Sequence, residues 1–314
     1  MTARIGLVGA RGHTGRELLR LIAGRDDLEL AFASSRELAG QAVSDIAPEV
    51  KTGLKFEALS PAEIAAQIVD AVILALPNGA AAPFLAAIEA SGRDVVIVDL
   101  SADYRFDAAW TYGLPEIYGR TALAGAKRIA NPGCYATAGQ LAIAPLRGML
   151  AAPAHVFGVS GYSGAGTTPS RKNDLDALRD NLMPYALTGH LHESEMSRHL
   201  DLPVRFTPHV AAFFRGIVAT VHLSLTEPLT RDALIERYRE AYAGESLIRV
   251  TDEIPEARDG AGHAGAVLGG FAVSPDGHHA VIVCALDNLL KGAAVQALQN
   301  LCLALGLPEV MPDA

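Results

Sequence analysis

The sequence predicts an α/β protein, with a Rossmann-like, doubly wound parallel sheet domain plus an α+β domain built on a mixed sheet. In the first half of the chain, short and almost continuously apolar runs alternate with helical patterns, as in parallel strands that are buried on both faces. Beyond about residue 140 the apolar runs lengthen, and polar stretches containing Gly and Pro separate them. This change of pattern predicts two domains.

The expected elements follow from these runs. Strands of the first domain are predicted at residues 5–8, 28–33, 71–76 and 95–100, with a helical pattern at 17–22 after the first strand. Strands of the second domain are predicted at residues 156–159, 216–225, 267–273 and 280–286, with a helix at 231–242 capped by Thr230. The apolar last helix, at 289–305, is expected to pack back on the first domain. We therefore predict a cofactor-binding domain at 1–140 plus 287–314 and a catalytic and oligomerisation domain at 141–286.

Charge, hydropathy and cysteine usage exclude several classes of protein. The formal net charge of −9 disfavours a nucleic-acid partner, because neutralising phosphates requires clustered Lys and Arg. No apolar run reaches the roughly 18–20 residues that span a bilayer, and the N-terminus shows no export signal. Three widely spaced cysteines support neither a disulfide framework nor a zinc site. We expect a reduced, cytoplasmic protein without metal, membrane or nucleic-acid partners.

A glycine-rich turn joins the first strand to the first helix. Its G-x-x-G-x-x-G spacing lets the backbone approach a pyrophosphate, which the amides and the dipole at the helix N-terminus favour. A tight turn without a ligand is the alternative, but the position at the first strand–helix junction favours dinucleotide binding. The expected contacts are Gly9, Arg11, Gly12, His13, Thr14 and Gly15.

The loops after the next two strands extend this cofactor site. The second strand ends in Ser34, Ser35 and Arg36, at the place where a carboxylate would select NAD. The arginine and the hydroxyls favour NADP(H), although an ordinary solvated arginine fits the same residues. Pro77 and Asn78 follow the next strand, at the carboxyl end of the sheet where such cofactors bind, and a plain turn explains them almost as well.

The segment Asn131-Pro132-Gly133-Cys134 ends a predicted strand and leads into a helix. Cys134 is therefore expected at or near a helix N-terminus, where the dipole favours a thiolate and the amides can bind an oxyanion. A buried structural role is the alternative, and it is the better interpretation of Cys284 and Cys302. The flanking turn favours Cys134 as a nucleophile.

A thiolate nucleophile needs a group that transfers protons. His190 and His192 lie close to Glu195 in the sequence, so we expect a catalytic histidine that is oriented by this carboxylate. A zinc site is disfavoured, because the spacing is not H-E-x-x-H and no third ligand is indicated.

A second glycine- and hydroxyl-rich turn follows the first strand of the second domain. Its many backbone amides suit a phosphate or the nicotinamide end of a cofactor, while a flexible loop is the alternative. We assign Ser163, Gly164 and Ala165 to the cofactor and Ser160 to the substrate.

Together these segments resemble the N-acetyl-γ-glutamyl-phosphate reductase family, the arginine-biosynthesis branch of the aspartate-semialdehyde dehydrogenase superfamily. The resemblance runs in the family's order over nearly the whole chain. It is carried by GARGHTGREL (9–18), LALPNG (74–79), VDLSADYR (98–105), YGLPEIYG (112–119), NPGCYAT (131–137), SGYSGAG (160–166), HLHESEM (190–196), PHVAAFFRGIVAT (208–220) and LDNLLKGAAVQALQN (286–300).

The resemblance implies the reduction of an acyl phosphate to an aldehyde. Cys134 would displace phosphate to form a thioester, which would accept a hydride from NADPH and collapse to N-acetylglutamate semialdehyde. His190 would be the acid–base group, with His192 as the second choice, and Asn288 would lie near the nicotinamide.

Substrate contacts are also implied by the resemblance. Arg105 and Arg215 are candidates for the phosphate and the carboxylates, since arginine pairs bidentately with both groups, but a structural ion pair is an equal alternative for each. Asn131 is assigned to the substrate as well. The chain departs from the family's usual residues at His13, Leu191 and Ser194, which puts a binding role of Leu191 in doubt and leaves both histidines and Glu195 in place.

Two other functions stay open. A related reductase could act on aspartyl phosphate or on a carrier-linked aminoadipyl or glutamyl phosphate, although an acidic carrier should require a basic rim around the pocket. A non-catalytic NADP-binding sensor would leave the Cys134 turn and the paired histidines unexplained. The second domain is expected to form the interface of a homodimer or a homotetramer.

Overall fold

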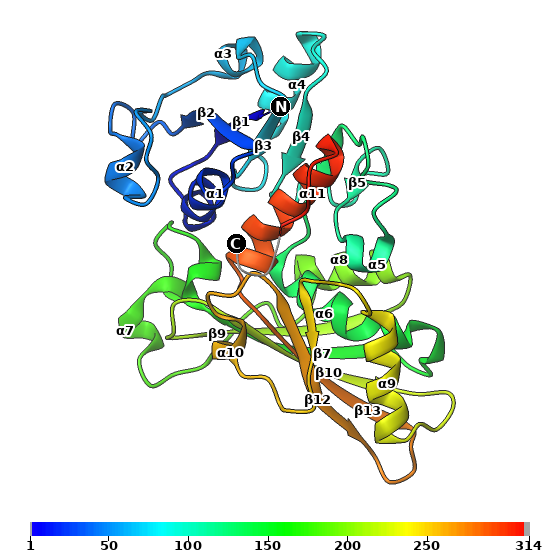
Figure 1. Ribbon diagram of the computed structural model, residues 1–314. Helices are drawn as coiled ribbons and strands as arrows, with labels where there is room; N and C mark the ends of the chain where they lie inside the picture. Colours follow the sequence, from blue (N-terminus) through cyan, green and yellow to red (C-terminus); the bar gives the residue numbers. More distant parts are fainter. Residues whose placement is uncertain (1, 311–314) are drawn as a thin grey trace. The chain divides into compact units, whose positions relative to one another are not determined.

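The computed structural model describes residues 2–310 and divides the chain into two compact units (Figure 1). The first unit contains the chain up to Pro132 together with Ala293–Val310, and the second unit is Gly133–Gly292. The expected boundaries at residues 140 and 287 both fall inside the second unit. Residues 311–314 of the expected first domain lie outside the described residues.

The first unit contains a six-stranded sheet in which every pair of neighbours is parallel, in the order β2-β1-β3-β4-β6-β5. Its strands are β1 (Ala3–Val8), β2 (Leu28–Ser34), β3 (Ala71–Leu74), β4 (Val96–Asp99), β5 (Thr111–Tyr112) and β6 (Arg128–Ala130). The chain runs from β1 to β2 on one side and then returns to β3 on the other side of β1. The carboxyl ends of β1 and β3 therefore flank the topological switch point, where doubly wound sheets bind their ligands.

Five short helices belong to the first unit. They are α1 (His13–Ala23), α2 (Val43–Ile46), α3 (Pro61–Ala66), α4 (Ala82–Ala90) and α5 (Pro115–Tyr118). The helix α1 buries Leu18, Leu19 and Ile22 on one face, as the apolar pattern predicted. The helix α4 begins only at Ala82, because the turn after β3 continues through Gly79, whose φ of 83° is not helical.

The helix α11 (Val295–Leu305) completes the first unit, where it packs against β4 and α1 (Figure 1). Its inner face is polar: Asn300 Nδ2 donates to the carbonyl oxygen of Gly113 at 2.9 Å and to Asn131 Oδ1 at 3.0 Å. Gln299 Nε2 donates to Glu116 Oε1 at 3.0 Å. Each of these buried amides has a partner, so the helix is fixed in one register on the sheet.

The second unit contains a seven-stranded mixed sheet in the order β11-β12-β13-β10-β7-β9-β8. Its strands are β7 (Ala154–Gly161), β8 (Met183–Pro184), β9 (Val204–Ala211), β10 (Ile217–Ser224), β11 (Ile248–Val250), β12 (Ala266–Val273) and β13 (His279–Leu286). The pairs β7–β9 and β11–β12 are parallel, and the remaining pairs are antiparallel. The two sheets confirm the predicted fold class.

One face of the mixed sheet is covered by helices. The α-helices of the second unit are α6 (Cys134–Ile143), α7 (Leu175–Leu178), α8 (Leu191–Leu200), α9 (Arg231–Ala241) and α10 (Ala257–Gly260). The 3-10 helices are η1 (Ala144–Met149), η2 (Tyr162–Ala165) and η3 (Arg171–Asn173), and η4 (Leu290–Ala294) is a π-helix. Because α6 consists mainly of small and apolar residues, it fits closely on β10 and β13, and every residue after Cys134 is buried.

Within residues 2–310, no helix combines the length and the apolar character that a membrane crossing requires.

Candidate active site

Cys134 is the first residue of α6, and the residue before it, Gly133, caps the helix with an extended backbone (φ −73°, ψ 149°). The Pro-Gly turn therefore starts the helix where the sequence predicted. The amides of the first helical turn have no acceptor within the helix, so they can bind an oxyanion beside the half-buried thiol. The other two cysteines differ: burial raises the pKa of Cys284 and of Cys302 to about 12, which keeps both thiols protonated.

The helix α8 is tied to the start of α6. Glu195 is fully buried, and its Oε1 accepts a hydrogen bond from the N–H of Gly133 at 2.9 Å. Further along α6, a Cβ atom at Gly139 would lie 2.2 Å from the Sδ of Met196, so a larger residue at this position would force that side chain to move. The sequence predicted that Glu195 orients a histidine and did not reveal this contact with the residue before the nucleophile.

The two histidines lie at the N-terminus of α8. His190 is the capping residue, and its Nδ1 accepts a hydrogen bond from the backbone N–H of His192 at 3.1 Å. Burial, and then the positive charge of Lys172, lower the pKa of His190 below its ordinary value. The ring is therefore neutral at pH 7, and with Nδ1 as the acceptor its proton is on Nε2. The two imidazole centroids are 4.8 Å apart.

Two tyrosines complete this cluster, and sequence reasoning gave neither of them a role. The hydroxyl of Tyr135 donates to the carbonyl oxygen of His209 at 2.6 Å, and the ring of Tyr185 lies edge-on to His190 at 5.7 Å between centroids. Burial is the main cause that raises the pKa of both phenols, and the neighbouring Cys134 sulfur contributes. Tyr135 could have been found in the NPGCY segment, whereas Tyr185 lies in a stretch without any motif.

The turn after β7 is linked to the end of β13. Asn288 Oδ1 accepts from the N–H of Gly216 at 2.8 Å, and its Nδ2 donates to Ser163 Oγ at 2.8 Å. Ser160 is buried, and its Oγ donates to the carbonyl oxygen of Gly161 at 2.9 Å. Ser163, Gly164 and Ala165 lie in η2 beside it. Asn288 is thus bonded directly to Ser163, and Ser160 is connected to it through Gly161, whose N–H donates to the carbonyl oxygen of Gly216 at 2.9 Å.

Arg215 forms an ion pair with the fully buried Asp287, with 2.6 Å between Nε and Oδ2. Asp287 also accepts hydrogen bonds from the N–H groups of Gly262 and Leu289. Of the two interpretations of Arg215 that the sequence left open, these contacts favour the structural ion pair over the substrate contact. Asp287 was missed, although it directly precedes the predicted Asn288.

The π-helix η4 approaches Cys134 closely. A Cβ atom at Gly292 would lie 2.7 Å from the Cβ of Cys134, so a glycine is required at this contact. The preceding residue, Lys291, is fully buried. The sequence predicted a regular helix over 289–305. The structure instead has a π-helix at Leu290–Ala294, with an extra residue in the turn that the sequence pattern did not indicate.

The glycine-rich turn of the first unit fits a dinucleotide. Each of its three glycines meets a different structural requirement. Gly9 has a φ of 83°, and Gly15 packs so closely that a Cβ atom would lie 2.7 Å from the carbonyl carbon of Ala10. At Gly12, the N-cap of α1, a Cβ atom would meet nothing within 4 Å. The chain therefore leaves space where the amides of α1 face outward, as a pyrophosphate needs. Arg11, His13 and Thr14 lie in the same turn.

The loop after β2 is organised by its own hydrogen bonds. The carbonyl oxygen of Ser34 accepts from Gly9 and Ala10, and Ser35 Oγ accepts from the N–H of Leu38 at 3.3 Å. Both serines are buried, while Arg36 is exposed. Across this loop, Arg11 pairs with Glu37, a contact that the sequence did not indicate.

The loops after β3 and β4 are joined to one another. Asn78 Oδ1 accepts from the N–H of Ala102 at 3.0 Å, and Asp103 Oδ1 accepts from the N–H of Gly79 at 2.7 Å. Pro77 and Asn78 are exposed, as a ligand-facing loop requires.

Arg105 and Asn131 are buried in the first unit. Arg105 Nε donates to the carbonyl oxygen of Asn131 at 2.9 Å, and a second guanidinium nitrogen donates to that of Leu100 at 2.8 Å. The Nδ2 of Asn131 donates to the carbonyl oxygen of Ala293 at 3.2 Å. These bonds give both side chains a part in holding the fold, while Ser160 and Arg215 belong to the second unit.

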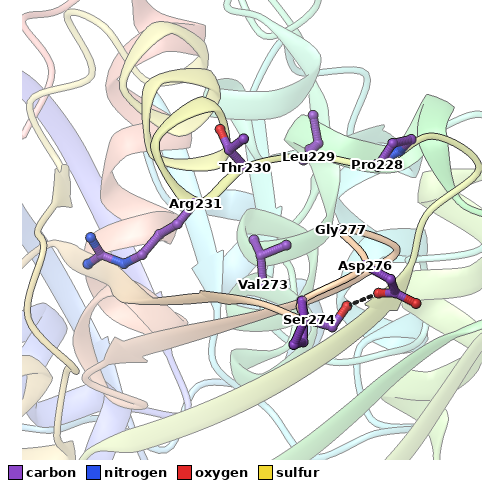
Figure 2. Close-up of a pocket in the computed structure, with 9 residues that line it drawn as sticks. Pro228, Leu229, Thr230, Arg231, Val273, Ser274, Asp276 and Gly277 are labelled. Atoms are coloured by element: carbon purple, nitrogen blue, oxygen red, sulfur yellow. Dashed lines mark hydrogen bonds between the residues drawn. The ribbon is translucent and has the colours of Figure 1, made fainter.

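A separate pocket lies at the start of α9 (Figure 2). Its polar side chains serve the local structure: Thr230 caps α9, Ser274 donates to Asp276, and Arg231 extends away from them to the carbonyl oxygen of Phe271. It contains none of the predicted site residues. Nor do the described residues contain a group of three or more His, Cys, Asp or Glu arranged to hold a metal ion.

Comparisons with known proteins agree with this division of the chain. Residues 4–126 match the family described as semialdehyde dehydrogenase, NAD binding domain. Residues 134–288 match the family described as semialdehyde dehydrogenase, dimerisation domain.

Several curated relatives resemble the chain over almost its full length. It is 59% identical over 309 residues to the N-acetyl-gamma-glutamyl-phosphate reductase of Stenotrophomonas maltophilia, covering 98% of this chain and 97% of that protein. It is 55% identical over 309 residues to the protein of the same name from Xylella fastidiosa, covering 98% of this chain and 94% of that protein.

The fold is also found among solved structures. The aspartate semialdehyde dehydrogenase II of Vibrio cholerae, complexed with ASA, matches with a TM-score of 0.78 and 17% sequence identity, covering 98% of this chain and 99% of that one. At this identity the likeness supports the fold alone.

Proposed function

The chain belongs to the semialdehyde dehydrogenase family, and we propose that it reduces N-acetyl-γ-glutamyl phosphate to N-acetylglutamate 5-semialdehyde with release of phosphate, in arginine biosynthesis. The observation that carries the proposal is the position of Cys134 as the first residue of α6, with the start of that helix tied to Glu195 and with His190 in the same cluster. Relatives that are 55–59% identical over nearly the whole chain carry the name of this reductase.

The first unit supports NADP(H) as the cofactor. The open space at Gly12 and the outward amides of α1 suit the pyrophosphate, and no carboxylate precedes Glu37 in the loop after β2. Since Glu37 is already paired with Arg11, the exposed Arg36 is the group that would meet a 2′-phosphate. When bound, the reduced nicotinamide supplies the hydride.

The chemistry assigned to the second unit begins with the thiolate. Cys134 attacks the acyl carbon, the bond from that carbon to the phosphate oxygen breaks, and a thioester forms. The amides at the start of α6 stabilise the negative oxygen of each tetrahedral intermediate. His190 holds a proton on Nε2 and donates a hydrogen bond to the same oxygen. Collapse of the second intermediate forms the aldehyde and restores the thiolate.

This arrangement favours His190 over His192 as the group that faces the substrate. Its Nδ1 is occupied by the N–H of His192, so the tautomer is fixed and Nε2 is the donor. Glu195 then acts as a positioning residue for the nucleophile through Gly133.

The assay that tests the function runs in the oxidative direction. Purified enzyme with N-acetylglutamate semialdehyde, phosphate and NADP is expected to form NADPH, and omission of phosphate is expected to abolish this. Turnover of aspartate semialdehyde or of a carrier-linked semialdehyde instead would overturn the substrate assignment. An enzyme that binds NADPH without turning over any of these aldehydes would be the sensor.

The preference for NADP has its own test. Replacing Arg36 by Ala is expected to lower the ratio of kcat/KM for NADP to that for NAD about tenfold, because a charge-assisted contact to the 2′-phosphate is lost. Replacing Arg16, outside this loop, is the control. An unchanged ratio in Arg36→Ala would remove the loop from cofactor selection.

The open face of the mixed sheet supports an oligomer. On this face the half-exposed Val218 and Thr220 of β10 lie opposite Val159 and Phe157 of β7, and Phe157 is 42% exposed. Such a face suits burial against a second copy. We expect a homodimer or a homotetramer in the cytoplasm. Phe157→Asp is expected to lower the mass measured by light scattering, and an unchanged mass would exclude this face as the interface.

A further inference from the structure

Lys172 places a positive charge beside the candidate active site of the second unit. It lies in η3, and its Nζ is 4.7 Å from the centroid of the Tyr185 ring, which in turn lies edge-on to His190. The positive charge of Lys172 lowers the pKa of His190, as the second cause after burial, which is the larger one. Cys134 joins the same cluster through its neighbour Tyr135, whose ring centroid lies 6.0 Å from that of His192, and the Cys134 sulfur contributes to raising the pKa of Tyr185. Lysine, aromatic ring, histidine and nucleophile therefore form one cluster.

The turn that carries Lys172 is held by its own hydrogen bonds. Asn173 Nδ2 donates to the carbonyl oxygens of Gly166 at 2.9 Å and Thr168 at 2.8 Å. The N–H of Ser170 donates to Asn173 Oδ1 at 2.8 Å. A cation on an anchored turn loses less conformational entropy when it binds a ligand than one on a flexible loop.

The acidic side chains next to this turn have other partners. Asp174 accepts from the N–H of Asp176 at the start of α7, and Asp176 pairs with Arg179 at 2.5 Å. Among the residues that the structure describes, no carboxylate forms an ion pair with Lys172. The ammonium rests instead on the Tyr185 ring, a contact that supports a cation without neutralising it.

We propose that Lys172 forms an anion subsite that holds a negatively charged oxygen of the acyl-phosphate substrate beside Cys134. The proposal rests on the proposed function, whose substrate carries both a phosphate and a carboxylate. A half-buried, unneutralised lysine on a fixed turn is suited to either group as a point charge. The subsite makes Lys172 a residue that selects anionic substrates.

The first experiment measures the subsite without any substrate. Iodoacetate and iodoacetamide alkylate the same thiol and are similar in size, but only iodoacetate is anionic. Lys172→Met keeps the aliphatic stem over Tyr185 and removes the charge. We expect the ratio of the Cys134 alkylation rates, iodoacetate over iodoacetamide, to fall about fivefold in this variant, as loss of about 1 kcal/mol of attraction requires.

Arg171→Met is the matched control, since Arg171 is the exposed neighbour on the same turn. Its ratio is expected to equal that of the wild type. Equal ratios in Lys172→Met and the wild type would overturn the subsite and leave the proposed function intact. A wild-type Cys134 that reacts with neither reagent would overturn the nucleophile, and the subsite with it.

The second experiment identifies the group that Lys172 holds. In the oxidative direction the phosphate and the carboxylate-bearing semialdehyde are separate substrates, so each has its own KM. Lys172→Met is expected to raise one of these KM values about tenfold, with kcat within about twofold, and Lys172→Arg to restore it in part. A rise in the KM for phosphate assigns the phosphate, and a rise in that for the semialdehyde assigns the carboxylate. Two unchanged KM values would overturn the proposal.

Discussion

Glu195 Oε1 accepts a hydrogen bond from the backbone N–H of Gly133 at 2.9 Å, so the carboxylate of one helix caps the start of another. The first amides of a helix have no partner within it, and glycine offers no side chain to cap them. Glu195 supplies an acceptor from α8 for the N–H of Gly133 alone, and α8 also has His190 as its capping residue. The bond thereby fixes the nucleophile and the histidine relative to each other within the second unit.

Replacing Glu195 by Ala is expected to lower the free energy of unfolding by about 1–3 kcal/mol, because the buried N–H of Gly133 loses its acceptor. Glu195→Gln keeps an oxygen acceptor of the same size and should retain most of that stability. Urea unfolding of the two variants measures the difference. If both variants lose the same amount, the bond to Gly133 is not what stabilises the start of α6.

Cys134→Ser is expected to bind NADPH as the wild type does and to lose almost all turnover, since a serine hydroxyl is a much weaker nucleophile than a thiolate. Fluorescence titration and the phosphate-dependent assay measure the two properties. Cys284→Ser is the control, because this buried thiol has a pKa of about 12 and lies outside the proposed chemistry. Retained turnover in Cys134→Ser would remove this residue as the nucleophile.

Gly12→Ser separates the binding role of the glycine-rich turn from its structural role. Serine is a favoured N-cap residue, and a Cβ atom at Gly12 would meet no atom within 4 Å, so the melting temperature should be retained or raised. Its hydroxyl would occupy the amides that we assign to the pyrophosphate, and the Kd for NADPH should then rise about tenfold.

Gly15→Ser is the contrasting variant, because there the added Cβ meets the backbone of Ala10 at 2.7 Å. This variant should lose stability. An unchanged Kd for NADPH in Gly12→Ser would show that the pyrophosphate does not approach Gly12.

Asp99 should make the stability of the protein depend on pH. Its side chain is fully buried, one carboxyl oxygen has no hydrogen-bond partner, and burial raises its pKa from 3.8 to about 6. The folded state therefore holds this proton more tightly than the unfolded state. The stabilisation is complete below pH 3.8 and is lost as the pH rises to about 6.

An asparagine at this position does not titrate. The free energy of unfolding of Asp99→Asn, minus that of the wild type, should thus increase by about 1.4 kcal/mol per pH unit between about pH 4 and pH 6 and then level off. Urea unfolding at a series of pH values measures this difference. A difference that is constant with pH would contradict the raised pKa.

The sequence predicted those strands, helix starts and turns that are determined by the pattern of neighbouring residues. The apolar runs at β3 and β4 are wholly buried, and those at β1 and β2 are buried over their last residues, so the hydrophobic runs located all four strands. The Pro-Gly turn located the start of α6. The glycine spacing before α1 also gave the correct turn. In each case a few neighbouring residues contain the information.

The parts that were missed depend on contacts between distant residues. Strand β9 contains Pro208, which argues against a strand, and forms because it pairs in parallel with β7. Glu195 and Gly133 are 62 residues apart, and nothing near either of them indicates the bond. Lys172 and Tyr185 lie in a polar stretch whose amino-acid sequence indicates only a loop, so their contact could not be predicted.

The segment that completes the first unit, Ala293–Val310, is synthesised after the whole of Gly133–Gly292. Asn300 bonds to Gly113 and Asn131, and Glu309 pairs with Arg120. Gly113, Asn131 and Arg120 of the first unit are synthesised early, but their partners are synthesised only after the second unit. Among residues 2–310, the second unit is one continuous stretch, Gly133–Gly292. During translation, the half that carries the nucleophile can therefore finish folding before the half that precedes it in the sequence. A ribosome that stops short of Ala293 would release a chain whose thiol is in place and whose nucleotide-binding half is unfinished.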